Sequence, residues 1–162
     1  MMKWKPVLVL LSLGLLSAAC HKNETARPGT ETVARQEAKW LTDFDPAQSE
    51  ARTENKMLLI NFTGSDWCPP CIMLHRQILS QPEFAEYAAK NLVLLEIDFP
   101  HTKEQSAALK AANEKLAERY GIYGFPTVIV LDFSGKKVGE LGYMPGGPEA
   151  FIAELEKLRP RS

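Results

Sequence analysis

The chain has 162 residues, of which 45% are hydrophobic and 24% charged, proportions typical of one globular domain with a buried core. These proportions exclude a disordered or fibrous protein. The formal net charge is −1 and no long run of basic residues occurs, so we expect no nucleic-acid partner, because binding to phosphates needs a basic patch.

The first 19 residues have the three-part pattern of a secretory signal peptide. Two lysines precede an apolar run at residues 7–16, and the small residues Ser-Ala-Ala close the segment. The apolar run is well short of the roughly 20 residues that a membrane-spanning helix needs. We therefore predict a signal peptide at residues 1–19, with an uncleaved membrane anchor as the alternative.

The segment LLSAAC, which ends at Cys20, resembles a bacterial lipobox, whose cysteine receives a diacylglyceryl group and becomes the mature N-terminus. The resemblance implies a lipid-anchored protein on the periplasmic side of the cell envelope. The outer membrane is favoured over the inner, because His21 stands where inner-membrane lipoproteins tend to carry aspartate. Ser17 stands where a lipobox usually has leucine, and Ser17 with Ala19 also fits ordinary signal peptidase, which would leave Cys20 a free thiol.

Residues 20–39 are polar, contain one Pro-Gly break and show no apolar periodicity, which is typical of a flexible tether. A tether of this length has a root-mean-square reach of about 25 Å, taking ~5–6 Å times the square root of the number of residues. It would hold the domain predicted at residues 40–162 away from a membrane surface.

Residues 40–162 have the patterns of an α/β domain, in which Asp45 is the expected N-cap of the first helix and Ser134-Gly135 a hairpin turn. The apolar strands need helices on both faces, which predicts a mixed sheet between helix layers. Helices are expected at residues 44–56, 69–90 with a break near Ser80 and Pro82, 103–120 and 147–158; strands are expected at 57–63, 91–99, 126–133 and 136–143.

The pair Cys68 and Cys71, separated by Pro69 and Pro70, has the spacing of a redox-active disulfide. Exchange needs a thiolate, and a helix start offers Cys68 unpaired N–H groups and the positive end of the helix dipole. The prolines cost little there, because first-turn N–H groups lack intrahelical acceptors. Cys71, one turn later, faces Cys68 within reach of a disulfide. We predict Cys68 as nucleophile and Cys71 as resolving thiol, with no other cofactor.

The sequence gives weaker support to three other functions of the Cys68–Cys71 pair. Zinc usually needs four ligands, and the chain has only one C-x-x-C pair besides Cys20. His75 lies near the pair and His101 is distant, so no metal site is expected. Haem attachment needs histidine after the second cysteine, where Ile72 stands. A structural disulfide that closes so short a loop removes little entropy from the unfolded chain.

The motifs W-C-P-P-C at Trp67–Cys71 and Y-G-I-Y-G-F-P-T at Tyr120–Thr127, in this order of elements, resemble the thioredoxin family over residues 40–158. The segments NFTGSDWCPPC and GYMPGG resemble exported thioredoxin-like proteins of bacteria and the periplasmic C-terminal domain of the transmembrane disulfide reductase. The resemblance implies a thioredoxin fold, with a mixed central sheet flanked by helices on both faces.

The resemblance also implies roles for residues around the pair. It implies that Pro126 is preceded by a cis peptide bond and faces the disulfide, and that Phe125 offers backbone groups to an extended substrate. Trp67 is expected to shield the flank of the pair, with a simple core aromatic as the alternative.

The chain departs from the family at the group that takes the proton of the resolving cysteine. Thioredoxins have a buried acid where this chain has Asn61, and a paired lysine near the position of Leu94. Glu96, Asp66 or water is expected to take over proton transfer, with Glu96 as an exposed strand residue the alternative.

These inferences predict a thiol–disulfide oxidoreductase of the cell envelope that acts as a monomer and reduces exported client proteins. A membrane electron donor would keep the pair reduced. The alternative is a non-catalytic binding or scaffold module that holds a client in the groove beside Pro126.

Overall fold

The computed structural model describes residues 38–160 together with Met1. Residues 2–19 of the predicted signal peptide and residues 20–37 of the predicted tether, Cys20 included, lie outside the described residues. Within residues 38–160, no helix is both long enough and apolar enough to cross a membrane.

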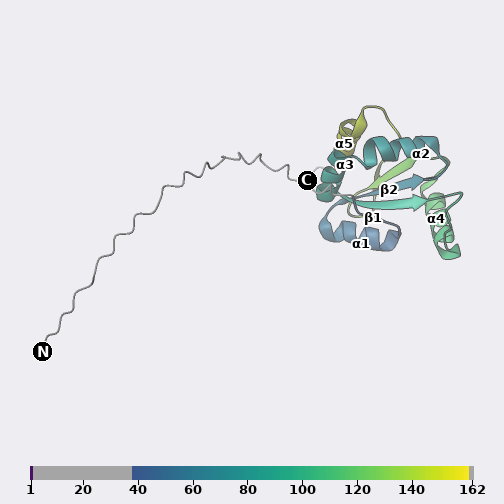
Figure 1. Ribbon diagram of the computed structural model, residues 1–162. Helices are drawn as coiled ribbons and strands as arrows, with labels where there is room; N and C mark the ends of the chain where they lie inside the picture. The colour runs from purple at the N-terminus through teal and green to yellow at the C-terminus, as the bar shows by residue number, and fades with distance from the viewer. Residues whose placement is uncertain (2–37, 161–162) are drawn as a thin grey trace, which may run out of the picture. The chain divides into compact units, whose positions relative to one another are not determined.

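One mixed sheet forms the centre of the domain (Figure 1). Its strand order is β1-β3-β2-β4-β5, in which β1, β2 and β3 are parallel and β4 and β5 are antiparallel to their neighbours. The strands are β1 (Trp40–Leu41), β2 (Met57–Thr63), β3 (Leu92–Asp98), β4 (Thr127–Leu131) and β5 (Lys137–Leu141).

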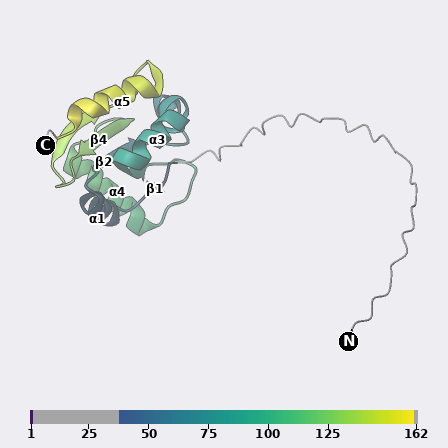
Figure 2. The same cartoon turned by 90° about the vertical axis from the view of Figure 1, so that its left-hand side faces the viewer.

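Helices cover both faces of the sheet, because successive side chains of each strand point to opposite sides and both sets are apolar (Figure 2). The first face packs against α2 (Pro69–Leu74), the π-helical turn η1 (His75–Leu79), α3 (Pro82–Asn91) and α5 (Gly147–Leu158). The second face packs against α1 (Phe44–Glu54) and α4 (Ala107–Tyr120). The fold class and layers expected from the sequence are confirmed.

The helix boundaries differ from the sequence prediction at the start of α1. Asp45 was the expected N-cap, and this was wrong: Asp43 precedes the helix in an extended conformation and its carboxylate accepts the Asp45 N–H at 3.3 Å. Asp43 can cap because it lies outside the helix, whereas Asp45 already has helical geometry. Gly121 ends α4 in the left-handed conformation (φ 65°), as the sequence predicted.

The helix that follows the cysteines runs from Pro69 to Leu79 through a π-helical turn, in which the Ser80 N–H donates to the His75 carbonyl at 2.9 Å. The predicted break near Ser80 is confirmed, and Pro82 opens α3, where its missing N–H is not needed. Strand β1 was not predicted, because a two-residue strand carries no periodic pattern.

Candidate active site

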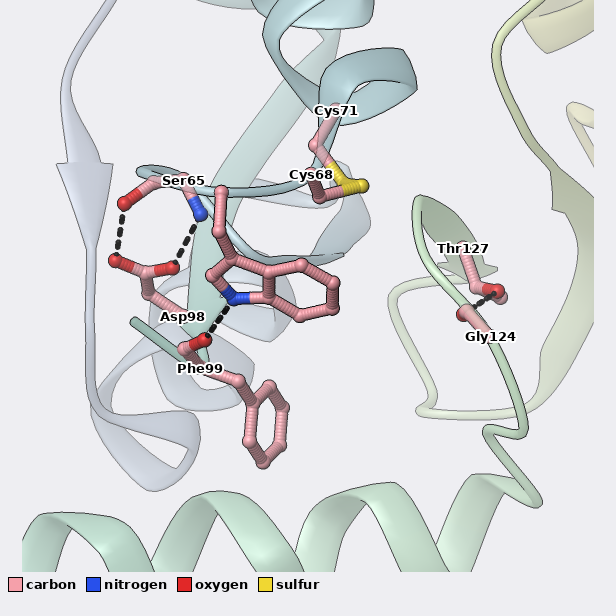
Figure 3. The surroundings of a disulfide bond; sticks show 8 residues. Ser65, Cys68, Cys71, Asp98, Phe99, Gly124 and Thr127 are labelled. Atoms are coloured by element: carbon pink, nitrogen blue, oxygen red, sulfur yellow. Dashed lines mark hydrogen bonds between the residues drawn. A yellow bond between two sulfur atoms is a disulfide. The ribbon is translucent and has the colours of Figure 1, made fainter. Parts of the chain in front are cut away.

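Cys68 and Cys71 form a disulfide at the start of α2 (Figure 3). Cys68 is extended, just outside the helix, and Pro69 and Pro70 occupy the first helical positions, which leaves the Cα atoms of the two cysteines 5.2 Å apart. Both cysteines are almost fully buried, with 4% of Cys68 and 3% of Cys71 exposed. A client disulfide can therefore reach Cys68 only by contacting the groups around it.

The loop between β2 and Cys68 is tied to the end of β3. The Ser65 N–H and hydroxyl donate to the two carboxylate oxygens of Asp98 at 2.9 and 2.6 Å (Figure 3). The Lys103 ammonium donates to the Ser65 hydroxyl oxygen at 2.8 Å. Cys68 itself donates its N–H to the Gly64 carbonyl at 2.9 Å. These bonds hold the approach to the disulfide in one conformation.

Asp66 also takes part in the hydrogen bonds that hold this loop. One carboxylate oxygen accepts the His101 N–H at 2.9 Å, and the other accepts both the N–H (2.7 Å) and the hydroxyl of Thr102. The Thr102 hydroxyl, followed by the backbone N–H groups, holds the pKa of Asp66 well below its usual range. A carboxylate stabilised in its charged form is a weak proton acceptor, so Asp66 anchors the loop.

Trp67 forms a wall beside the disulfide. Its Nε1–H donates to the Phe99 carbonyl at 2.8 Å (Figure 3), and its ring stacks on His101 with centroids 4.4 Å apart and planes 3° apart. Phe125 meets the indole edge-on at 6.1 Å and stacks on Phe99 at 5.1 Å. Because 40% of Trp67 is exposed, it is not a core aromatic.

The loop before β4 faces the disulfide from the other side (Figure 3). The Phe125–Pro126 peptide bond is cis. The Thr127 hydroxyl donates to the Gly124 carbonyl at 2.8 Å, which closes the loop around the proline. Phe125 and Pro126 lie in this loop between Gly124 and Thr127, and the Phe125 ring packs against Trp67.

Two polar residues lie on the first face of the sheet, below α2. Asn61 is 3% exposed, and its Oδ1 is buried with no hydrogen-bond partner among the described residues. Glu96 lies directly opposite Asn61 in the parallel register of β2 and β3, and it is half-buried. Burial, and then the charge of Asp98, raise the pKa of Glu96, while His75 and Lys103 act in the opposite direction.

Because of the direction in which α2 runs, Asn61 and Glu96 lie toward the end of the helix that carries Cys71. The chain reverses after β2, so α2 runs back over the sheet, and Leu74 shares a core cluster with Leu59. Cys71 lies about one helical turn before Leu74, nearer the end of β2. Asn61 lies two residues beyond Leu59 on the same face of that strand. The row of Asn61 and Glu96 therefore lies on the Cys71 side of this cluster.

The sequence did not predict the hydrogen bonds that join Ser65 to Asp98 and Asp66 to Thr102, because these partners are 33 to 36 residues apart along the chain. It also missed Gly64, whose position a side chain could not share with the Trp67 ring. The loop FTGSDW before Cys68, which is one residue longer than the usual thioredoxin loop, was the one available signal. Within residues 38–160, no three histidine, cysteine or acidic side chains are grouped to hold a metal.

Replacing Gly64 by alanine should displace Trp67. A Cβ at this position would lie 2.5–2.8 Å from three atoms of the indole ring. The ring must then move, at the expense of its bond to Phe99 and its stacking on His101. We expect the free energy of unfolding to fall by about 1–3 kcal/mol in urea denaturation, with a shifted Trp67 indole N–H resonance.

The matched control is Gly124→Ala in the loop opposite, where an added Cβ would meet nothing within 4 Å. We expect this change to stay within about 0.5 kcal/mol of wild type. Equal stabilities for the two variants, with the indole resonance unmoved, would contradict the assigned position of Trp67.

Residues 44–159 match the family model described as the thioredoxin-like domain. The chain belongs to the thioredoxin-like family. It is 30% identical over 148 residues to the disulfide bond reductase DsbH of Chlamydia pneumoniae, covering 91% of this chain and 89% of the relative. The thioredoxin-related protein DsbJ of the same species is 25% identical over 103 residues, which are 64% of this chain and 30% of that relative.

Solved structures agree with this assignment. The DsbH oxidoreductase superposes with a TM-score of 0.73 at 30% identity, covering 87% of this thioredoxin-like chain and 94% of that chain. A thioredoxin from Thermus thermophilus superposes with a TM-score of 0.56 at 20% identity, covering 75% of this chain and 87% of its own, which supports the fold alone. With its disulfide at the start of α2, the protein is a thiol–disulfide oxidoreductase of the thioredoxin-like family.

Proposed function

We propose that this thioredoxin-like oxidoreductase reduces disulfides of exported client proteins. The observation that carries the proposal is the Cys68–Cys71 disulfide, which is nearly buried and is faced by the loop that contains Gly124 and Thr127. The relative that is 30% identical over most of its length is named a disulfide bond reductase, which supports the same direction of electron flow here.

The exchange proceeds in two steps. The Cys68 thiolate attacks one sulfur of the client disulfide, which forms a mixed disulfide and releases the other client sulfur as a thiolate. The Cys71 thiolate then attacks the Cys68 sulfur, which reforms the Cys68–Cys71 disulfide and releases the second client thiol. Two electrons pass from the enzyme to the client, and a membrane electron donor restores the dithiol.

The second step needs a group that takes the proton of Cys71, and we assign this role to Glu96. Asp66 has a lowered pKa and three donors on its carboxylate, whereas Glu96 has a raised pKa and lies on the face below α2. A carboxylate whose pKa is raised is a better base at neutral pH. The unpaired Oδ1 of Asn61, opposite Glu96, is suited to orient a water between the thiol and the carboxylate.

The client is held as an extended segment beside Phe125 and Pro126, with Trp67 as the opposite wall. The aromatic contacts among Trp67, Phe99 and Phe125 keep this wall in place before a client arrives. Preorganised walls reduce the entropy lost on binding.

The proposed location is the periplasmic side of the cell envelope. Residues 1–19 would direct export, the tether at 20–39 would space the domain from the membrane, and a lipid on Cys20 would anchor it, with the outer membrane favoured. A diacylglyceryl group with an added N-acyl chain exceeds the single chain that gives marginal membrane binding.

Reduction of insulin by the purified full-length protein tests the function. With dithiothreitol as electron source, we expect precipitation of the insulin B chain well above the uncatalysed rate. A scaffold module of the same fold would bind clients without turnover, so a rate equal to that of dithiothreitol alone would favour the scaffold and overturn the proposal.

Replacing Cys20 by alanine should separate anchoring from catalysis. We expect the variant to lose acylation and to leave the membrane fraction, while insulin reduction stays unchanged, because Cys20 lies outside the domain that carries the disulfide. Intact-mass measurement of the native protein provides the check. A mature chain that carries an unmodified Cys20 thiol would show export by ordinary signal peptidase and no lipid anchor.

A further inference from the structure

A hollow next to the active site is lined by residues that include Trp67 and two residues of α4. It has a volume of about 290 Å³. Its lining includes Trp67, Phe99 and His101, together with the exposed residues Lys110 and Glu114, which lie one turn apart on α4. The disulfide chemistry described above uses none of the residues contributed by α4.

The hollow is built from parts that are already held in place. Trp67 is bonded to the Phe99 carbonyl, and the His101 N–H is bonded to Asp66. Gln105, which also lines the hollow, donates from Nε2 to the Asp98 carbonyl at 3.1 Å. A cavity with fixed walls binds with little ordering cost, as small-molecule sites do.

The hollow shares Trp67 with the route that a client takes to Cys68. Because only 4% of Cys68 is exposed, a client chain that reaches its sulfur contacts the neighbouring residues, of which Trp67 is 40% exposed. The same residue forms a wall of the hollow. A client segment engaged at Cys68 therefore has side chains that can reach the mouth of the hollow.

The lining indicates which side chain fits. The volume is at the low end for a ligand site, which suits one large side chain. Trp67 and Phe99 offer apolar aromatic surface, whereas Gln105, Lys110 and Glu114 offer hydrogen-bonding groups at the edge. An aromatic ring with a polar tip satisfies both halves, which describes tyrosine and tryptophan.

We propose that this hollow is a specificity subsite that selects clients with a tyrosine or tryptophan close to the reactive cysteine. The proposal rests on the proposed function, because it specifies which clients that same active site reduces. It assigns client selection to α4 as well as to the loop of Pro126.

A peptide scan tests the subsite. The probes are nine-residue serine-rich peptides with one central cysteine, blocked as a mixed disulfide with thionitrobenzoate, whose release is followed by absorbance. Tyrosine, tryptophan, phenylalanine or alanine replaces serine at each of the eight other positions in turn. At one or two positions, we expect tyrosine and tryptophan to raise kcat/KM about tenfold over serine, mostly through KM, with phenylalanine intermediate.

Two variants of α4 complete the test. Glu114→Trp fills the hollow from α4, so the tyrosine peptide should react no faster than the serine peptide. Ala111→Trp adds the same side chain at an exposed position of α4 that does not line the hollow, and it should retain the preference. Thermal unfolding of both variants shows that they are folded.

The outcomes separate the two proposals. A wild-type protein that reduces insulin but prefers no aromatic residue at any position overturns the subsite alone. A preference that persists unchanged in Glu114→Trp overturns it as well, because the residue must then bind elsewhere. A wild-type protein that fails to reduce insulin overturns the proposed function, and the subsite falls with it.

Discussion

Replacing Cys68 by serine should abolish disulfide exchange, whereas replacing Cys71 by serine should leave mixed disulfides between Cys68 and clients. A serine hydroxyl is not ionised at neutral pH and cannot attack a disulfide, so the first variant should react at the uncatalysed rate. In the second variant, Cys68 still attacks, but nothing displaces the client.

The two variants are compared by insulin reduction and by non-reducing gels of envelope extracts, with Cys20→Ala as the matched cysteine control. We expect disulfide-linked, dithiothreitol-sensitive species only for Cys71→Ser. If Cys68→Ser traps clients instead, the roles of nucleophile and resolving thiol are reversed. A protein whose two thiols stay free in every glutathione mixture would contradict a reversible disulfide.

Replacing Glu96 by glutamine should slow the second step by about 10²-fold at neutral pH, a typical contribution of a general base. The carboxylate must be ionised to accept the Cys71 proton. The wild-type rate of mixed-disulfide resolution should therefore rise with pH through the pKa of Glu96, which burial and Asp98 raise. The variant should lack this rise. Stopped-flow measurement of resolution, from pH 5 to pH 9, provides the profile.

Two further substitutions locate the proton path. Asn61→Asp places an acid where thioredoxins have one, so it should speed release of the mixed disulfide and restore part of the rate lost in Glu96→Gln. Asp66→Asn should leave the pH profile unchanged, because Asp66 anchors the loop. An unchanged resolution rate in both Glu96→Gln and Asn61→Asp would place proton transfer elsewhere.

The raised pKa of Glu96 also affects stability, in a direction that follows from linkage. The folded protein holds this proton more tightly than the unfolded chain, so the free energy of unfolding decreases as pH rises from 4.5, the ordinary value, through the raised pKa. Glutamine carries no charge at any pH and removes this decrease. At neutral pH, Glu96→Gln should therefore unfold at a higher urea concentration than wild type, although it is the slower enzyme.

Local patterns in the sequence predicted most of the fold. Apolar runs marked β2, β3 and β4, glycine marked the end of α4, and Pro82 marked the start of α3. The spacing of Cys68 and Cys71 predicted the disulfide, because a residue at a helix start and the residue three positions later lie close together. The cis bond before Pro126 came from the family resemblance, since a proline alone seldom implies a cis bond.

The sequence by itself determined strands β2 to β5, the two helix layers and the redox pair, because each depends on a short period of apolar residues or on neighbours in the chain. Only the tertiary structure decided which residues surround the redox pair and how they contact one another. It tied Asp66 to Thr102, placed Trp67 against Gly64, set Glu96 opposite Asn61 and formed the hollow against α4. These contacts join segments that are distant in the chain or depend on how a side chain folds back, and neither leaves a periodic signal in the sequence.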